Sequence, residues 1–402
     1  MKMAAVDLTV NISGISYPNP LIVASGPSTL NPDAIIKCFI SGAGGAVTKT
    51  ITFDPMQRLQ PKPRMYVLNK KDAFAGKFYS FYSIDLMSEY EPDKWVVFLK
   101  DIKRKMNKQN LYGVLIASIA GRNYEEWGKL AEMMASAGAD AIELNLSCPH
   151  IEEEKSGFMG RAATSSPEIV RNIIKTVREN SSIPVIGKLT PHGANPLELA
   201  KIMVTAGIDA LVSTARFQGL VIDAEALKVV SWGGFGGYGG PWQLPISLSW
   251  TAHILNENLG VPIIGSGGIA SGEDVSKFLL IGAEAVQCCT TVVLMGHKII
   301  PKMLLELKNW MTRHGFTKIE DFRGLIIKKG IVKTEKLNRK KIYIFSVTKK
   351  CIKCGICVRA CPYESISLDF PKKAKIDHRK CDNCGLCLSI CPVDAIKMTE
   401  RG

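Results

Sequence analysis

The sequence predicts an α/β protein in which a closed (β/α)8 barrel is followed by a small domain rich in cysteine. The first observation is a stretch with helical spacing that ends in glycine and leads into an apolar run. It occurs four times, in SGAGGAVTKT from Ser41, SAGADAIELN from Ser136, TAGIDALVST from Thr205 and IGAEAVQCCT from Ile281. Glycine at a helix C-cap before a Val/Ile/Leu run is typical of an αβ junction. Repeated junctions of this kind imply repeated βα units and a parallel sheet.

The second observation is a series of eight candidate strands. They begin near residues 20, 46, 113, 141, 184, 210, 262 and 285, and the segments between them carry apolar residues at helical spacing. Eight βα units in about 300 residues favour a closed barrel, and an open doubly wound sheet is the alternative. The long insertion from Phe53 to Asn110 is rich in aromatic residues and is expected to lie over the barrel mouth.

The third observation is a pair of cysteine runs near the C-terminus. CIKCGICVRACP begins at Cys351 and CDNCGLCLSICP at Cys381, and each reads C-x2-C-x2-C-x3-C-P, the signature of a two-cluster bacterial ferredoxin. The spacing places three thiolates of each run on one loop, and the fourth reaches the other cluster. We therefore expect one [4Fe-4S] cluster on Cys351, Cys354, Cys357 and Cys391, and the other on Cys381, Cys384, Cys387 and Cys361. Zinc is the alternative, but it does not account for the trailing Cys-Pro pairs.

The predicted boundaries place the barrel at residues 1–320, a basic linker at 321–345 and the ferredoxin-like iron–sulfur domain at 346–402. The chain of 402 residues has a formal net charge of +14, and a dense basic group lies between Lys328 and Lys350. No recognition motif interleaved with aromatic residues surrounds this group, so a nucleic-acid role is not predicted. A solvated linker is one interpretation, and a surface that steers an acidic electron-transfer partner is the other.

The expected compartment is the cytoplasm. The N-terminus, MKMAAVDLTV, lacks an apolar stretch of signal-peptide length, and about 18 uncharged apolar residues nowhere run together. No membrane anchor is therefore expected. Because disulfides are rare in the cytoplasm, the cysteines are better assigned to metal binding or catalysis, with Cys38 and Cys288 taken as buried structural residues.

The cysteine-rich domain indicates which further cofactor the barrel needs. Iron–sulfur clusters exchange single electrons, so two-electron chemistry in the barrel requires a converter, which is usually a flavin. NAD is the alternative, because Gly234, Gly236 and Gly239 match G-x-G-x-x-G. These glycines do not lie between a strand and an opening helix, and we interpret them as a flexible loop at the barrel mouth.

The predicted C-terminal ends of the strands, where a barrel of this type carries its chemistry, are unusually polar. They comprise Ala24–Gly26, Thr48–Thr50, Ser118, Asn145–Cys148, Lys188–Thr190, Ser213–Thr214, Ser266–Gly268 and Cys289–Thr291. Lys49 and Lys188 could stabilise a reduced, anionic flavin. The glycine pair could present backbone N–H groups to a phosphate.

With TKT, ELNLSCPH, KLTP and SGG at strand ends, the barrel resembles the dihydroorotate and dihydropyrimidine dehydrogenases, and with the cysteine runs the resemblance covers nearly the whole chain. It implies that the barrel binds FMN. The implied FMN site comprises Ala24, Ser25, Lys49, Thr50, Lys188, Gly240, Gly267, Gly268, Thr290 and Thr291. Lys188 would face the N1/O2 side of the flavin ring, and Gly267, Gly268 and Thr290 would bind the phosphate.

The resemblance also implies a substrate site. Asn123 and Asn145 would hydrogen-bond the substrate, with Ser147 and His150 close by. Cys148 would exchange a proton with one substrate carbon while hydride passes between the adjacent carbon and N5 of the flavin. A thiol of unperturbed pKa about 8.5 suits this role near neutral pH. Residues 151–157 could close over it as a lid that excludes water.

The resemblance breaks after the sixth strand, where the pyrimidine enzymes carry Asn-Thr and this chain reads LVSTARFQGL. Ala215 cannot pair with an amide, and unmatched polar groups of a pyrimidine would cost about 1–3 kcal/mol. Arg216 offers a bidentate donor for a carboxylate, although it could equally face solvent or the FMN phosphate. The predicted substrate is a dihydropyrimidine or a related compound, with a carboxylate as the hypothesis that Arg216 suggests.

Two classes of function follow. In the first, an FMN and iron–sulfur oxidoreductase interconverts a C–C single and double bond beside a carbonyl, as dihydropyrimidine or dihydroorotate dehydrogenases do. In the second, the protein is an electron-transfer subunit without a substrate, which the polar residues around Cys148 argue against. No FAD or NAD module is visible, so the expected electron partner is an NAD(P)H-linked flavoprotein subunit or a ferredoxin. A homodimer and either reaction direction remain open.

Overall fold

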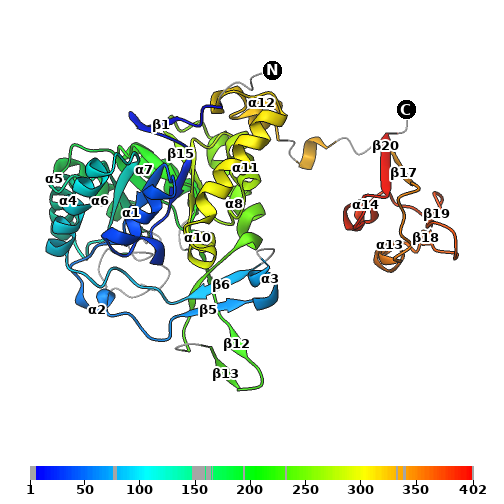
Figure 1. Ribbon diagram of the computed structural model, residues 1–402, viewed down its shortest axis with the longest axis horizontal. Helices are drawn as coiled ribbons and strands as arrows, with labels where there is room; N and C mark the ends of the chain where they lie inside the picture. Colours follow the sequence, from blue (N-terminus) through cyan, green and yellow to red (C-terminus); the bar gives the residue numbers. More distant parts are fainter. Residues whose placement is uncertain are drawn as a thin grey trace. The chain divides into compact units, whose positions relative to one another are not determined.

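The computed structural model describes residues 6–75, 79–146, 159, 164, 166–192, 195–230, 233–331, 334–337 and 341–400 (Figure 1). The chain forms two compact units, Met1–Gly330 and Ile331–Gly402. The first unit reaches Gly330 because the short helix α12 (Leu325–Lys329) contacts α9 (Gly272–Ile281). Each unit has its own hydrophobic core.

Eight parallel strands close into a barrel in the first unit. They are β3 (Leu21–Val23), β4 (Gly45–Val47), β7 (Val114–Ile119), β8 (Ala141–Asn145), β9 (Val185–Lys188), β10 (Ala210–Val212), β15 (Ile263–Ser266) and β16 (Ala285–Cys288). Their order is β10-β15-β16-β3-β4-β7-β8-β9, and β10 also pairs with β9, which closes the ring. The predicted (β/α)8 barrel and its eight strands are confirmed, and the open-sheet alternative is wrong.

The barrel strands are short and almost wholly buried. Every residue of β3, β4, β7, β15 and β16 is buried. Parallel strands that are covered on both faces carry continuous apolar runs, because neither face meets water. The continuous apolar runs of the sequence therefore form the inner layer of the fold, which is the barrel.

Helices form the outer layer around the barrel (Figure 1). They are α1 (Pro32–Ile40), α4 (Pro92–Lys108), α5 (Tyr124–Ser136), α6 (Pro167–Glu179), α7 (Pro196–Thr205), α8 (Leu244–Asn256), α9 and α11 (Ile299–Arg313). Helix α4 buries Trp95, Leu99, Ile102 and Met106, which recur at helical spacing, and it contacts α1 and α5. Residues 92–108 thus belong to the outer layer, and the prediction that all of 53–110 lies over the mouth is wrong for them.

Polar side chains determine where several of these helices begin. The side chains of Asn31, Asn123, Ser166, Asn195 and Ser271 each accept a hydrogen bond from a backbone N–H of the first turn. Such caps satisfy N–H groups that have no partner inside the helix. They fix the residue at which each of these five helices begins.

A four-stranded antiparallel sheet, in the order β11-β14-β6-β5, accompanies the barrel. Its strands are β5 (Met65–Leu68), β6 (Ser80–Ser83), β11 (Phe217–Gly219) and β14 (Gly236–Gly239). The prediction of a flexible glycine loop is therefore wrong for β14. Glycine is required there for space: a Cβ atom on Gly236 would lie 2.5 Å from the Tyr82 ring, and one on Gly237 would lie 2.6 Å from Cζ of Arg216.

Shorter elements complete the first unit. One hairpin joins β1 (Val10–Ile12) to β2 (Ile15–Tyr17), and another, β12 (Ile222–Asp223) with β13 (Lys228–Val229), extends away from the barrel (Figure 1). The short helices are η1 (Pro27–Thr29), α2 (Pro55–Arg58), α3 (Lys70–Phe74), η4 (Pro241–Gln243), α10 (Thr290–Met295) and η5 (Ile319–Asp321). In the described ranges, no helix has the length and apolar character needed to span a bilayer.

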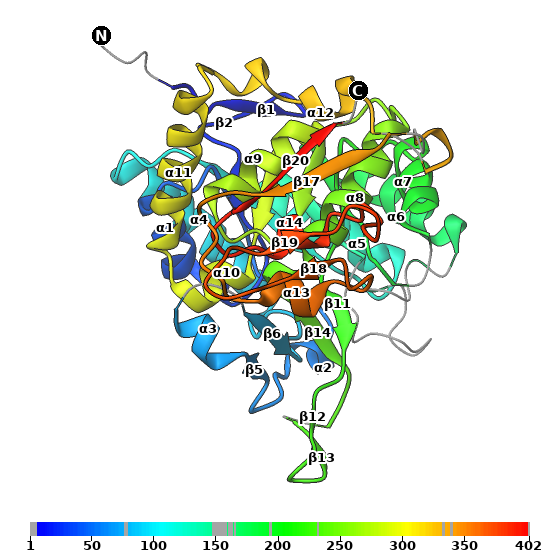
Figure 2. The ribbon, with the colours of Figure 1, turned by 90° about the vertical axis from the view of Figure 1, so that its right-hand side faces the viewer.

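The second unit consists of two small antiparallel sheets and short helices. Strands β17 (Tyr343–Val347) and β20 (Ile396–Glu400) run side by side (Figure 2), and β18 (Ile366–Ser367) pairs with β19 (Lys375–Ile376). The helices are η6 (Thr334–Lys336), α13 (Ile356–Ala360) and α14 (Leu386–Ile390). The buried core is small and comprises Phe345, Val347, Ile366, Ala374, Ile376 and Ile396. A core of this size usually needs a metal centre to support it.

Two halves of the second unit repeat the same backbone. Lys353, Gly355 and Glu364 have positive φ angles, and so do Asn383, Gly385 and Asp394, each 30 residues later. The same offset separates the two cysteine runs. The internal repeat of the sequence is therefore also a repeat of conformation.

Candidate active site

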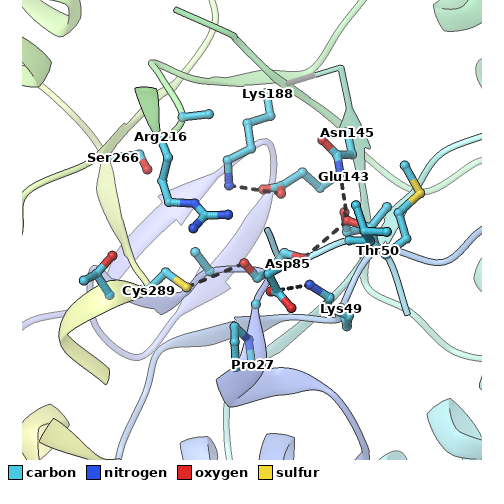
Figure 3. A pocket seen from close by; sticks show the side chains of 18 of the residues that line it. Pro27, Lys49, Thr50, Asp85, Glu143, Asn145, Lys188, Arg216, Ser266 and Cys289 are labelled. Atoms are coloured by element: carbon cyan, nitrogen blue, oxygen red, sulfur yellow. Dashed lines mark hydrogen bonds and ion pairs between the residues drawn. The ribbon is translucent and has the colours of Figure 1, made fainter. Parts of the chain in front are cut away.

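A polar pocket lies at the C-terminal ends of the barrel strands (Figure 3). Strand ends form most of its wall, and residues 81–87 of the insertion form the rest. The lining residues are Ala24, Ser25, Gly26, Pro27, Lys49, Thr50, Phe81, Asp85, Leu86, Met87, Ser118, Glu143, Asn145, Lys188, Ala215, Arg216, Ser266, Cys289 and Thr290. The structure thus brings many of the polar strand ends into one cavity.

Lys49, at the end of β4, is paired with a carboxylate that the sequence did not reveal. Its Nζ lies 2.5 Å from Oδ2 of Asp85, and Nε of Arg64 lies 3.3 Å from Oδ1 of the same carboxylate. Burial alone would raise the pKa of the Asp85 carboxyl, but Lys49 and two nearby guanidinium groups outweigh it, so this pKa is lowered. Asp85 is therefore an anion that fixes the position of the Lys49 ammonium.

Lys188, at the end of β9, is held in a second buried network. Its Nζ donates to Oε1 of Gln287 at 2.6 Å and lies 3.3 Å from Oε1 of Glu143. The Gln287 amide donates to the other oxygen of Glu143, whose side chain is 1% exposed. The three side chains come from β8, β9 and β16, so the network ties the ammonium to strands from different parts of the barrel.

A chain of hydroxyl groups positions Asn145. Its Nδ2 donates to Oγ1 of Thr50 at 2.9 Å, and that oxygen lies 3.0 Å from Oγ of Ser118 and 3.4 Å from Oγ of Ser25. These residues end four strands of the barrel. The carboxamide of Asn145 is therefore held at the pocket wall, as a substrate-binding group requires.

Arg216 lies in the pocket (Figure 3). Its Nη1 donates to Oγ of Ser83 at 2.6 Å and, with a longer distance of 3.4 Å, to the carbonyl of Gly237. Among the residues that the structure describes, Nε and Nη2 have no acceptor, and the nearest strand, β14, leaves room for the guanidinium only because residue 237 is glycine. Two donors of the guanidinium thus remain available to a ligand.

A smaller cavity beside Arg216 has the groups that a phosphate needs. It is lined by Ala215, Arg216, Gly240, Gln243, Ser266, Gly267, Gly268, Ile269, Gln287, Cys288, Cys289, Thr290 and Thr291. Gly267 and Gly268 have φ angles of +96° and +84°, and Cβ atoms there would meet atoms of Gln243 and Leu244 within 2.4 Å. Within the described ranges, neither of these backbone N–H groups has an acceptor. The hydroxyl of Thr291, in contrast, is occupied by Tyr79 at 2.7 Å and by the carbonyl of Ile269 at 2.6 Å.

These two adjoining cavities fit FMN. The smaller one offers two unpaired backbone N–H groups and the Thr290 side chain to a phosphate, and the larger one offers Lys49 and Lys188 to a ring that becomes anionic on reduction. The buried Oγ of Ser247, which would lie 2.4 Å from a Cβ atom on Gly267, has no hydrogen-bond partner among the described residues. The chemistry of the donor set therefore agrees with the predicted flavin site.

Cys289 borders both cavities and was not predicted as a site residue. A Cβ atom on Gly26 would lie 2.6 Å from its Sγ, so glycine at position 26 makes room for the thiol. Burial raises the pKa of Cys289, although the nearby charge of Arg216 works against that shift. Cys38 and Cys288 lie in the core, where burial raises both thiol pKa values to about 12.

Some predicted site residues lie elsewhere. Asn123 is exposed, lines neither cavity, and accepts a hydrogen bond from the Glu126 N–H at 2.9 Å as the cap of α5. The structure does not bring it into the pocket that Asn145 and Arg216 line. Ser147, Cys148 and His150, with the expected lid at 151–157, lie outside the described residues.

The missed residues had weak signals in the sequence. Glu143 and Gln287 interrupt apolar strands, in AIELN and AVQC, and a buried polar residue in such a strand usually needs a partner. Asp85 had no signal, because it comes from the insertion and reaches the pocket only through the fold of β5 and β6.

The cysteines of the second unit gather into two groups. Cys351, Cys354, Cys357 and Cys391 line one small cavity, and Cys361, Cys381, Cys384 and Cys387 line another. The fourth cysteine of each run thus lies with the first three of the other run. No three of the described His, Cys, Asp and Glu side chains converge closely enough for a single metal ion; a [4Fe-4S] cubane holds its thiolates further apart.

Comparison with known proteins agrees with both units. Residues 7–311 match the family described as dihydroorotate dehydrogenase, and residues 346–398 match the 4Fe-4S dicluster domain, which overturns the zinc alternative. The chain is 33% identical over 321 residues to the catalytic subunit of dihydroorotate dehydrogenase B (NAD(+)) from Pyrococcus abyssi, covering 80% of this chain and 99% of that protein.

A second relative spans both units. The chain is 30% identical over 367 residues to the NAD-dependent dihydropyrimidine dehydrogenase subunit PreA of Escherichia coli K12, covering 89% of this chain and 86% of that protein. Among solved structures, a DHODH from Eimeria tenella in complex with ferulenol superposes with a TM-score of 0.66 at 22% identity, over 79% of this chain and 88% of that one. At that identity the likeness supports the barrel fold alone.

Proposed function

Since the chain belongs to the dihydroorotate dehydrogenase family and is an FMN and iron–sulfur oxidoreductase acting on CH–CH groups, we propose that its substrate is an enoyl compound with a carboxylate. The reaction interconverts a C–C single and double bond beside a carbonyl. Electrons pass through the two [4Fe-4S] clusters of the second unit. A carboxylate-bearing dihydropyrimidine is the simplest substrate that meets these conditions.

Arg216 is the observation that supports a carboxylate. Two guanidinium donors remain available in the pocket, and a carboxylate is the group that accepts a pair of them in a fork. Ala215 beside it offers no side-chain hydrogen bond to a ring amide. A neutral pyrimidine would leave the two available guanidinium donors without a charged acceptor, which costs about 1–3 kcal/mol for each unmatched group.

The other residues of the pocket bind and orient FMN and the substrate. FMN supplies the acceptor or donor of a hydride at the substrate carbon. Lys49 and Lys188 hold positive charge at fixed positions, because Asp85 and Glu143 anchor their ammonium groups. Fixed charge of this kind stabilises developing negative charge without reorganisation during the reaction. Asn145 hydrogen-bonds a polar edge of the substrate.

Cys148 is proposed as the residue that exchanges a proton with the substrate carbon next to the one that exchanges hydride. It follows Asn145 by three positions in the sequence, and Asn145 lines the pocket. Its thiol has the intrinsic acidity that proton transfer near neutral pH requires. Ser147 and His150 are proposed to contact the same substrate, and Asn123 is not included because its side chain caps α5.

An anaerobic titration of the flavin tests the substrate. Uracil, dihydrouracil, orotate, dihydroorotate and open-chain enoates with a second carboxylate are added in turn to protein with intact clusters, and the flavin absorbance is followed. We expect redox equilibration only with carboxylate-bearing compounds. Normal flavin reduction by dihydrouracil would contradict the carboxylate proposal. Reduction by dihydroorotate alone would identify the activity as that of a dihydroorotate dehydrogenase.

The competing class of function is an electron-transfer subunit without a substrate. Cys148→Ala separates it from the enzyme: flavin and clusters should remain, and turnover of the substrate found in the titration should fall by about 100-fold or more. Cys289→Ala is the matched control, since that thiol lies in the pocket with no proposed proton transfer. Unchanged turnover of the Cys148 variant with the physiological electron donor would favour the electron-transfer class.

The electron partner is proposed to be a second subunit or a soluble carrier. The relatives named above are described as a catalytic subunit and a subunit of NAD-dependent enzymes. An NAD(P)H-linked flavoprotein or a ferredoxin would supply or remove the electrons that the clusters carry.

A further inference from the structure

The second unit is strongly basic, and its charge is unevenly divided between the two cysteine repeats. Residues 331–402 contain 16 lysines and arginines and seven aspartates and glutamates, a formal net charge of +9 out of the +14 of the chain. An oxidised [4Fe-4S] cluster with its four thiolates contributes roughly −2. The basic residues thus more than balance both clusters and leave an excess of positive charge.

Of the two repeats, only the first carries a net positive charge. Residues 349–364, called the first repeat here, carry four basic residues and one acidic one. The equivalent residues 379–394, the second repeat, carry two of each. The difference arises at three pairs of positions, which are Ile352 and Asp382, Lys353 and Asn383, and Arg359 and Ser389. Charge compensation of the clusters alone would not require this asymmetry, since both repeats hold the same kind of cluster.

Lys353 shows that the asymmetry has a conformational cost. Its φ is +60°, and φ of the equivalent Asn383 is +63°. Asparagine enters this left-handed region more readily than other residues with a side chain, and a lysine there costs about 1 kcal/mol. A protein selected only for the stability of this turn would carry asparagine in both repeats. The turn therefore does not require lysine at position 353.

The first repeat also has the form of a docking surface. Lys353 and Ile352 line the cavity formed by Cys351, Cys354, Cys357 and Cys391, and Ile352 is 59% exposed. Cys354 is exposed, and so are Lys349, Lys350 and Arg359 of the same repeat. An apolar centre with a charged rim is typical of transient protein interfaces. At the second repeat, Asp382 takes the place of Ile352 in the equivalent cavity.

We propose that the first repeat is the docking site for an acidic protein that exchanges single electrons with the cluster held by Cys351, Cys354, Cys357 and Cys391. The partner would present carboxylates to Lys349, Lys350, Lys353 and Arg359. One electron passes between the partner's redox centre and this cluster, with no bond made or broken. The inference rests on the proposed route of electrons through the clusters and does not depend on the substrate of the barrel.

Exchanging charges between the repeats tests the docking site. The first variant is Ile352→Asp, Lys353→Asn and Arg359→Ser, and the reciprocal variant is Asp382→Ile, Asn383→Lys and Ser389→Arg. Each substitution copies a residue that the other repeat already carries on the same backbone, so both variants should fold and hold clusters. The combined six-substitution protein keeps the net charge of the wild type. Visible and electron paramagnetic resonance spectra check that both clusters are present.

The measurement is a stopped-flow reaction of the oxidised, full-length protein with the hydroquinone of an acidic flavodoxin, followed by semiquinone absorbance without any barrel substrate. We expect the first variant to react about tenfold more slowly than wild type at low ionic strength, and to lose most of the salt dependence. The reciprocal variant should react at least as fast as wild type. Reduction by dithionite should be the same in all four proteins.

Two results would overturn the proposal. If the first variant keeps the wild-type rate and salt dependence, the first repeat does not bind the acidic carrier. If the combined variant, which carries the docking residues on the second repeat at the wild-type net charge, stays as slow as the first variant, these residues do not form a docking surface by themselves. Because no substrate is present, failure here is distinct from failure of the proposed CH–CH chemistry, which the flavin titration tests by itself.

Discussion

Each of the two lysines in the pocket has a carboxylate beside it, whereas Arg216 has none within 4 Å among the described residues. Lys49 and Lys188 are therefore held by Asp85 and Glu143, and the guanidinium is bound only by neutral groups. A cation in this state is available to an anionic ligand, because no internal ion pair must be broken first. Lys49 and Lys188 are thus fixed by carboxylates, whereas Arg216 is the cation that we propose binds the substrate.

Arg216→Gln should weaken the binding of a carboxylate-bearing ligand and leave FMN in place. Loss of a charged hydrogen-bonded pair costs about 1.5–3 kcal/mol, so the Kd of orotate should rise by about 10- to 100-fold. The perturbation of the flavin spectrum measures this Kd. Arg64→Gln is the matched control, since Arg64, like Arg216, lowers the pKa of Asp85 through its charge but does not line the pocket. Equal losses in both variants would mean that the effect acts through Asp85 alone.

Glu143→Gln should destabilise the barrel and lower its flavin content. The substitution keeps the shape of the side chain but leaves the charge of Lys188 without its buried partner, at a cost of about 3–5 kcal/mol. Urea unfolding followed by flavin fluorescence reports the change. Glu179→Gln removes an exposed partner of Lys175 at 3.9 Å and should change stability by less than about 0.5 kcal/mol. A Glu143 variant as stable as this control would contradict the expectation.

Cys289 should react with iodoacetamide slowly near neutral pH and faster as pH rises. Burial raises the pKa of this thiol, and only the thiolate is nucleophilic, so the fraction that reacts grows as pH approaches the raised value. Cys288, with a pKa of about 12 in the core, should stay unmodified under the same conditions. Peptide mass spectrometry of flavin-free protein measures both. FMN should protect Cys289, and modification that is unaffected by FMN would place the flavin elsewhere.

The elements around the pocket explain why recognition and chemistry come from different parts of the chain. The barrel strands and their C-terminal ends supply Lys49, Lys188, Glu143 and Asn145. Hydrogen bonds join each of these strands to its neighbours. The antiparallel sheet supplies Ser83 from β6 and the glycine surface of β14 on which Arg216 lies. Ser83 and β14 therefore set the position of Arg216, whereas Asp85, which follows β6, sets that of Lys49.

Gly237→Ala should reproduce the effect of losing Arg216 without removing the residue. The added Cβ atom would lie 2.6 Å from Cζ of Arg216, which must then leave its position between β14 and Ser83. The Kd of orotate should rise by about tenfold, while flavin content stays constant. In the control Gly234→Ala, the new Cβ atom would be 3.5 Å from Ile84, an ordinary contact, and binding should not change. An unchanged Kd in the first variant would show that the guanidinium position is unimportant.

At the scale of the whole molecule, regular repetition made the fold predictable. Buried parallel strands between glycine-capped helices have a local signature, so all eight barrel strands were found from the sequence. The cysteine spacing likewise predicts which four cysteines lie together at each cluster. In contrast, Asp85 and β14 depend on pairing between segments about 150 residues apart, since β6 pairs with β14. The glycine-rich strand was taken for a loop because the neighbour that requires glycine, Tyr82, is distant in sequence.

The two units should respond differently to the loss of the clusters. The core cluster of the second unit has six residues within the described part of the chain, whereas the core of the first extends through the whole barrel. Cluster binding therefore supplies much of the folding free energy of residues 341–400, as metal does in other small domains. After oxidative destruction of the clusters, amide hydrogens in β17 and β20 should exchange rapidly, while those in β7 keep their protection and the flavin spectrum is unchanged. Hydrogen exchange with mass spectrometry compares the two states, and the anaerobic protein serves as the control. Lasting protection of β17 and β20 without clusters would mean that the small core suffices.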